Sequence, residues 1–345
     1  MTKKEEVELY RQDEGINQSF LKSVAINDHK AKKSDSESIA MGMGQLTDCM
    51  LLTPELVEEY YYLSDLLRPP TPLIKQTIDK VFTDIGEWDV TAFVEAYRQF
   101  SDAQNPTKED TIMKGVDKAQ DYWEELVKGV GKTIITKEYW LNCRKAADNL
   151  LTNQFTKHHF ENTLFADIQY QIPIYDEIEY VYKKDDTSDL VRRKGLLDLF
   201  IIDEAHKTVQ FKDLKTTSVT PDEWWKMARK FRYDFQVAWY YDIIQNLFPE
   251  YRQLLPELIV YSFAAPNKPF TKIINLDDLH IGRHGCNLQK SFIRYEGEVV
   301  EPIEERIVGW EECLSRYLLC QENGWPDWDV NYWTSNGMNN KNIWQ

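Results

Sequence analysis

The chain has 345 residues, of which 42% are hydrophobic and 13% aromatic, so it can bury a large core and wholesale disorder is excluded. Its 41 basic and 57 acidic residues give a formal net charge of −16, which excludes binding to nucleic acid through a broadly basic surface. No apolar run approaches about 18 residues and the first residues have no apolar core, so neither a membrane helix nor a secretory signal is predicted. Five scattered cysteines without CxxC spacing favour reduced thiols and a cytoplasmic location.

Helical patterns dominate the first part of the chain. Asn17 or Ser19 is a suitable cap for a short helix, and Thr136 is a suitable cap for a longer one. Prolines at 54 and in the segment RPPTP indicate breaks between helices. The predicted helical stretches are 16–33, 39–63 with a break at Pro54, an insertion at 73–132, and 136–158.

The middle of the chain changes to strand patterns. Residues 165–182 alternate strongly, and the runs GLLDLFII and KTVQFKDLK predict two strands joined by a hairpin loop, DEAH. DEAH is also the spelling of a helicase motif, but the chain has no GxxxxGK[ST] phosphate loop, which excludes that activity. The elements predicted beyond the hairpin are a helix from 220 to about 248, a strand at 256–264, a helix at 302–321 and a tail at 322–345.

Two carboxylates stand out in the predicted hairpin. Asp198 lies in the apolar first strand, and pairing of the strands around the loop brings it beside Asp213 in the second. Because neighbouring buried carboxylates repel each other, a divalent cation between them would be favourable, and their hard oxygen ligands suit Mg²⁺ or Mn²⁺. Lys215 shares a strand face with Asp213 and can orient a water or stabilise charge on a phosphate. This arrangement is suited to metal-assisted phosphodiester hydrolysis.

The helix that follows carries two more polar groups. Gln236 and Tyr240 are four residues apart, so they share one helical face. GLLDLF, FKDLKTT and QVAWY occur in the order hydrophobic-Asp, Asp-x-Lys-Thr-Thr and Gln-x-x-x-Tyr. In this order they resemble the PD-(D/E)XK nuclease superfamily, and more narrowly the phage-type exonucleases of the exonuclease VIII (RecE-like) and RecB-nuclease group.

Further segments carry the same resemblance. INQSFLKSVAINDHKAKK resembles the opening helix of those proteins, MGMGQLTDCMLLTPE resembles their Gly-rich segment that ends in Leu-Leu-x-Pro-Glu, and GWPDW resembles their usual ending. The resemblance covers residues 16–65, 136–265 and 300–330 in outline. It implies an α/β fold, a central mixed sheet flanked by helices as in restriction endonucleases. Residues 1–345 would form a single nuclease domain with the 73–132 insertion and the 322–345 tail.

The resemblance also implies roles for single residues. Asp198 and Asp213 would be metal ligands, Lys215 the catalytic lysine that orients the attacking water, and Gln236 and Tyr240 the groups that position DNA or the scissile phosphate. The family's N-terminal histidine ligand falls on Asp48, an oxygen donor that either preserves metal binding or marks a lost activity.

The expected function is a metal-dependent exonuclease that degrades linear double-stranded DNA from its ends in phage-type recombination. Two local basic clusters would line the DNA channel, with Arg193, Lys194, Lys226, Arg229 and Lys230 as contacts. The resemblance further implies a single-strand annealing recombinase as partner and a ring-shaped homo-oligomer. Two alternatives stay open, namely a catalytically inactive scaffold with the nuclease fold, and a structure-specific or RNA-directed nuclease.

Overall fold

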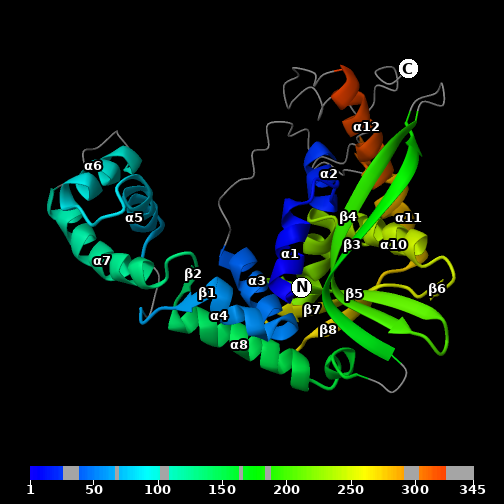
Figure 1. Cartoon of the computed structure of the whole chain (residues 1–345), viewed down its shortest axis with the longest axis horizontal. Helices are drawn as coiled ribbons and strands as arrows, with labels where there is room; N and C mark the ends of the chain where they lie inside the picture. Colours follow the sequence, from blue (N-terminus) through cyan, green and yellow to red (C-terminus); the bar gives the residue numbers. More distant parts are fainter. Residues whose placement is uncertain are drawn as a thin grey trace, which may run out of the picture. The chain divides into compact units, whose positions relative to one another are not determined.

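The computed structural model describes residues 1–25, 39–66, 70–101, 109–162, 166–182, 188–290 and 303–323 (Figure 1). Most of the predicted tail and part of the first basic cluster lie outside the described residues. The chain divides into two compact units, Met43–Asp148 and the combination of Met1–Gly42 with Asn149–Gln345. The predicted insertion at 73–132 therefore lies inside a larger unit that starts earlier and ends later.

The unit Met43–Asp148 is mainly helical. Thr71 caps α5 through its side chain, and Asp89 caps α6 by accepting from two backbone N–H groups, so local capping sets both helix starts. The elements in this part of the chain are α3 (Ile39–Leu52), η1 (Pro54–Leu56), α4 (Val57–Tyr60), β1 (Tyr61–Leu63), α5 (Pro72–Asp84), α6 (Val90–Phe100), α7 (Glu109–Lys128), β2 (Thr133–Ile135) and α8 (Lys137–Thr152). The helical character predicted for 73–132 is confirmed for its described residues.

Helices α5, α6 and α7 share a core of their own. The buried residues of each helix recur at intervals of three or four, as a helix with one apolar face requires. The members of this core are Ile74, Ile78, Val81, Phe93, Ala96, Tyr97, Ile112, Val116, Ala119, Tyr122 and Trp123.

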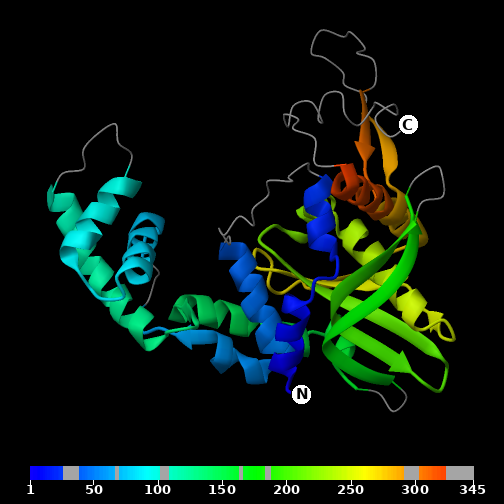
Figure 2. The same cartoon turned by 45° about the horizontal axis from the view of Figure 1, so that its top comes forward.

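The other unit contains the central sheet. Its six strands run in the order β3-β4-β5-β7-β8, with β6 paired to β5 at one side. The elements are α1 (Lys3–Gln12), α2 (Gln18–Ala25), η2 (Lys157–His159), β3 (Ala166–Val181), β4 (Ser188–Asp203), β5 (Thr208–Thr217), η3 (Pro221–Glu223), α9 (Trp224–Lys230), α10 (Tyr233–Leu247), β6 (Arg252–Gln253), β7 (Glu257–Ser262), β8 (Phe270–Ile273), α11 (Leu276–His284), β9 (Cys286–Lys290), β10 (Ile303–Ile307) and α12 (Trp310–Asn323). The predicted fold, mixed α/β with a central sheet flanked by helices, is confirmed (Figures 1 and 2).

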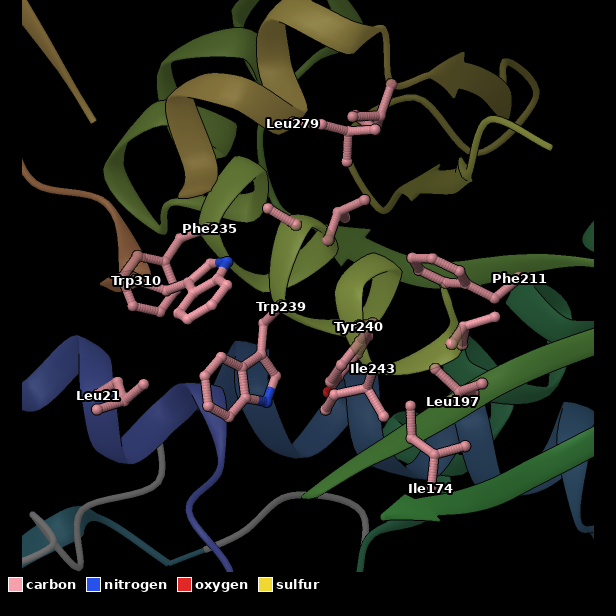
Figure 3. Packing of buried hydrophobic residues seen from close by; sticks show 14 of the residues in the cluster. Leu21, Ile174, Leu197, Phe211, Phe235, Trp239, Tyr240, Ile243, Leu279 and Trp310 are labelled. Carbon is pink, nitrogen blue, oxygen red and sulfur yellow. The ribbon is translucent and has the colours of Figure 1, made fainter. Parts of the chain in front are cut away.

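The connection between β5 and β7 places a helix on the sheet. These strands pair in parallel, so the chain must cross over between them, and it does so through α9 and α10. Figure 3 shows how Trp239, Tyr240 and Ile243 of α10 pack against Ile174 and Leu197 of the strands. Helices α2, α11 and α12 supply Leu21, Leu279 and Trp310 to the same core.

Three sequence predictions need correction. The helix predicted from 220 to 248 is broken at Arg232, whose backbone has a φ of 52°, so α9 and α10 are separate helices. The helix predicted at 302–321 begins only at Trp310, because 303–307 form β10, which pairs with β9. The strand predicted at 195–202 begins at Ser188, since the long strand β3 pairs with β4 from Ala166 to Val181 with a single gap at Gln171. In the part of the chain that the structure describes, no helix is both long and apolar enough to cross a bilayer.

Candidate active site

The predicted pair of aspartates lies where two strands separate. In the β4–β5 ladder the last paired residues on this side are Leu199 and Lys212, and the next positions along the same register are Asp198 and Asp213. The backbone N–H of Leu214 donates to Asp198 Oδ2 at 2.7 Å, so a side chain takes the hydrogen bond that a continued ladder would supply. Asp198 and Asp213 therefore face each other just beyond the end of the ladder, without pairing through their backbones.

Asp198 is held from both sides. The side-chain amide of Gln171 on β3 donates to Asp198 Oδ1 at 2.9 Å, while Leu214 donates to the other oxygen. Burial, and then the negative charge of Asp213, raise the pKa of Asp198 to about 7. The metal-free site therefore retains a proton up to neutral pH.

Asp213 is almost completely buried and is contacted by the helix above it. The side-chain amide of Gln236 donates to Asp213 Oδ1 at 2.9 Å and lies 3.5 Å from the hydroxyl of Tyr240. Burial, followed by the charges around the site, raises the pKa of Tyr240 well above its usual value, so its hydroxyl stays protonated. Gln236 and Tyr240 thus converge on the aspartates, as the i, i+4 spacing predicts.

Lys215 completes the group. Its ammonium forms an ion pair with Asp213 Oδ2, and it lies 5.0 Å from the ring centroid of Tyr233. Burial alone would lower the pKa of Lys215, but attraction to Asp213 and Asp198 outweighs this and raises it. Lys215 is therefore a permanent cation in this site.

Two neighbouring residues were missed by the sequence analysis. Gln171 has no motif, and its link to Asp198 appears only from the pairing of β3 with β4. Lys22 of α2 donates to the backbone carbonyl of Phe231 at 2.9 Å. Burial, and then repulsion by Lys215, lower the pKa of Lys22 to about 7, which places a second amine within electrostatic reach of the site.

Gly195 lets Tyr240 approach the sheet closely. A Cβ at this position would lie 2.8 Å from two ring atoms of Tyr240, and the ring has no room to move because it is buried. We expect Gly195→Ala to lower the free energy of unfolding by about 1–3 kcal/mol, as overpacking does, and to displace Tyr240 from Gln236. Urea unfolding measures the change.

The matched control for this change is Gly115→Ala in α7. There the nearest atom to a new Cβ is 3.5 Å away, and a helical Gly→Ala change is expected to stabilise by about 0.5–1 kcal/mol. Equal effects of the two substitutions would contradict the close-packing argument.

The raised pKa of Asp198 predicts that the metal-free protein loses stability as pH rises. The protonated carboxyl is favoured in the folded state, so the contribution is complete below the ordinary pKa of 3.8 and is lost as pH rises through about 7. We expect the free energy of unfolding to fall by about 4 kcal/mol over this window for wild type relative to Asp198→Asn, since each pKa unit corresponds to about 1.4 kcal/mol. Urea titrations of both proteins in chelator from pH 4 to pH 8 measure the difference, and parallel pH profiles would contradict it.

The donor set fits a hard divalent cation. Two adjacent carboxylates, one of them with its pKa raised by burial and by its neighbour, gain from a cation that offsets their charge. Within the described ranges, no group of three or more His, Cys, Asp or Glu gathers as a metal site. With Asp198 and Asp213 as ligands, several coordination positions of the metal would be left to water or substrate, which is common for Mg²⁺ in proteins. Asp48 lies on α3 in the unit Met43–Asp148, and its role as a ligand stays a prediction.

Two of the predicted DNA contacts need correction. Arg193 is 1% exposed, and its guanidinium forms an ion pair with Asp176 between the rings of Trp239 and Trp310. Lys194 is 4% exposed, and its ammonium donates to the backbone carbonyl oxygens of Tyr10 and Asp13. Both side chains are buried and bind partners inside the protein, so the prediction that they contact DNA is wrong for this structure.

The predicted contacts on α9 are accessible. Lys226, Arg229 and Lys230 are exposed, and Lys226 makes a surface ion pair with Glu223 at 3.2 Å. Helix α9 is connected to the site through aromatic contacts. The ring centroids of Trp224 and Tyr233 are 6.0 Å apart, and the Tyr233 ring in turn contacts the Lys215 ammonium. Arg229, Trp224 and Tyr233 also line a hollow of about 290 Å³.

Comparisons with known proteins add little. No family model and no curated protein matches the chain. One solved structure, described as a "Putative exonuclease" from Eubacterium rectale, is similar at 12% identity and a TM-score of 0.42, over 81% of this chain and 80% of that one. Because overlap at this level carries no argument about function, the reasoning that follows depends on the site itself.

Proposed function

We propose that this chain is a metal-dependent deoxyribonuclease, and that it degrades linear double-stranded DNA from its ends. The observation that supports this most is the hydrogen-bonded and ion-paired group formed by Asp213, Lys215, Gln236 and Tyr240, with Asp198 close enough for the charge of Asp213 to raise its pKa. Asp213 is 2% exposed and the Lys215 side chain is 15% exposed. A site without a role would gain nothing from enclosing such charges, because their desolvation is costly.

Asp198 and Asp213, with Asp48 as a third donor, would hold Mg²⁺ or Mn²⁺. When bound, such a cation supplies Lewis-acid stabilisation of phosphate charge and an acidified water. Gln171 and Gln236 hold one oxygen of each aspartate through their amides, so the carboxylates are oriented before a ligand arrives.

The remaining residues have roles that follow from their ionisation. Because its pKa is raised, Lys215 acts as a cation and hydrogen-bond donor to the attacking water and to the negative phosphate, and not as a base. Tyr240 keeps its proton and can donate to a phosphate oxygen. Lys226, Arg229 and Lys230 would contact the DNA backbone beyond the site, which would make binding weaker at high salt.

The test compares two DNA substrates. A 5′-labelled linear duplex and a closed circle are incubated with Mg²⁺ or with chelator, beside Asp213→Asn to exclude a contaminating nuclease. The proposal expects loss of the linear DNA only, and only with metal and wild type. Cutting of the circle would indicate an endonuclease, and digestion of RNA in its place an RNA-directed enzyme. No digestion with Mg²⁺ or Mn²⁺ would support an inactive scaffold.

The partners belong to the same proposal. We propose that the protein acts with a single-strand annealing recombinase and forms a ring that encloses DNA, so that topology provides the grip that a net charge of −16 does not. Sedimentation at several concentrations tests the ring, and a monomer throughout would contradict it.

A further inference from the structure

Gln171 combines two unusual features at the position next to Asp198. Its φ is 49°, in the left-handed region that residues with side chains rarely adopt, although it lies in the middle of β3. Tyr170 pairs with Leu199 and Ile172 pairs with Leu197, so the residue opposite Gln171 is Asp198, yet these two do not pair through the backbone.

The side chain explains what this backbone shape achieves. Gln171 Nε2 donates to Asp198 Oδ1 at 2.9 Å, so the amide replaces the missing backbone contact with a contact to the carboxylate. Asp198 is unpaired through its backbone on the β5 side as well, where Leu214 donates to Oδ2. The β3–β4 ladder is therefore interrupted at Asp198 and the β4–β5 ladder ends just before it, and on each side a donor from the neighbouring strand reaches the Asp198 carboxylate.

The amide is suited to this task for a chemical reason. An amide N–H₂ donates without adding charge, whereas a glutamate here would place a third negative group beside Asp198 and Asp213. Asp213 is held in the same way, since Gln236 Nε2 donates to its Oδ1 at 2.9 Å. Each carboxylate thus accepts one uncharged amide donor, which holds it in place without cancelling its negative charge.

We propose that Gln171 is a positioning residue, which uses a strained backbone and its amide to fix the Asp198 carboxylate for binding a divalent cation. This rests on the proposed function in that it takes Asp198 as a metal ligand. Strained non-glycine residues occur at functional sites when the surrounding structure holds them in place, as the long β3–β4 pairing does here. Residues that hydrogen-bond to a metal ligand commonly contribute about 10–100-fold to the metal affinity of the site.

The test uses three variants and two readouts. Gln171→Ala removes the amide and keeps the strain, while Gln171→Gly removes the amide and allows the positive φ. Gln169→Ala is the matched control, because Gln169 lies two residues away on β3 and its amide donates to Asp167 at 3.0 Å. Mn²⁺ affinity is measured by calorimetry, and the DNA hydrolysis rate is measured at limiting and saturating Mn²⁺.

The proposal expects both Gln171 variants to bind Mn²⁺ about 10–100-fold more weakly and Gln169→Ala to bind it as wild type does. Hydrolysis should recover substantially at saturating Mn²⁺, since the ligands themselves are intact. If Gln171→Ala does not fold, Gln171→Gly alone decides the outcome, because glycine accepts the backbone shape.

Unchanged Mn²⁺ affinity in a folded Gln171 variant would overturn the inference, and so would an equal loss in Gln169→Ala. If wild type binds Mn²⁺ without cutting DNA, the proposed function fails while the affinity comparison still decides the role of Gln171. If wild type binds no Mn²⁺, both fail.

Discussion

Replacing Lys215 by alanine is expected to reduce the rate of DNA hydrolysis about 10²–10³-fold at saturating metal. The ammonium is paired with Asp213, and the Lys215 side chain is only 15% exposed. Removing one well-placed donor to a developing negative charge has an effect of this size. Lys215 also forms an ion pair with Asp213 Oδ2, so it competes with a metal ion for that oxygen. We therefore expect Mn²⁺ affinity to stay the same or increase while the rate falls.

Lys207→Ala is the matched control for this experiment. Lys207 lies in the β4–β5 hairpin loop, is 58% exposed and pairs with Glu204 at 2.6 Å, so its loss should leave the hydrolysis rate unchanged. Rates on the linear duplex and Mn²⁺ calorimetry measure both variants. A Lys215→Ala protein that hydrolyses DNA at the wild-type rate would remove Lys215 from the mechanism, and a parallel loss of metal binding would make its role structural.

The part of the site that the sequence predicts well depends on local regularity. The register of a hairpin follows from its loop. Here the loop is 204–207, one residue later than the predicted DEAH segment, so Asp198 and Asp213 lie equally far from it and face each other. Likewise Gln236 and Tyr240 share a face in any helix, and the crossover from β5 to β7 directs that face at the sheet. These arguments need only periodicity and connectivity.

Other features depend on pairing between distant segments. The backbone of Gln171 has its shape because β3 pairs with β4 on either side of it, and its own neighbours in sequence look like any alternating strand. Lys22 reaches the site only because α2 packs in the same core as α10. Arg232 adopts a left-handed conformation that splits a stretch which otherwise has uniform helical patterning.

The error at Arg193 and Lys194 has a related cause. The strand is predicted to begin at Gly195, where the apolar run GLLDLFII starts, so the basic residues before it fall in a predicted basic cluster. In the structure the strand begins at Ser188, and its pairing carries Arg193 opposite Asp176. Because the buried carboxylate of Asp176 on β3 forms an ion pair with Arg193, the Arg193 side chain is part of the protein interior and not a DNA contact.

Arg193→Ala is expected to lower the free energy of unfolding by about 3–5 kcal/mol. Its guanidinium donates to Asp176 through Nε at 2.8 Å and also through a terminal nitrogen. It also makes cation–π contacts, since it lies 5.3 Å from the ring centroid of Trp239 and 5.5 Å from that of Trp310. Without it, the Asp176 carboxylate stays buried, and the side-chain donor left to it among the described residues is Asn246, at 3.0 Å. An unpaired buried charge has a cost of this order, which urea unfolding at neutral pH measures.

Arg229→Ala separates this structural role from DNA binding. Arg229 is exposed on α9, so its loss should change stability by no more than about 0.5 kcal/mol while weakening binding to duplex DNA. Arg193→Ala should show the reverse, with wild-type DNA affinity in whatever fraction remains folded. A double change that replaces both Arg193 and Asp176 with apolar residues should recover much of the stability, because it removes both buried charges. If Arg193→Ala instead weakens DNA binding without loss of stability, Arg193 belongs to the DNA surface and its burial in β4 is incidental.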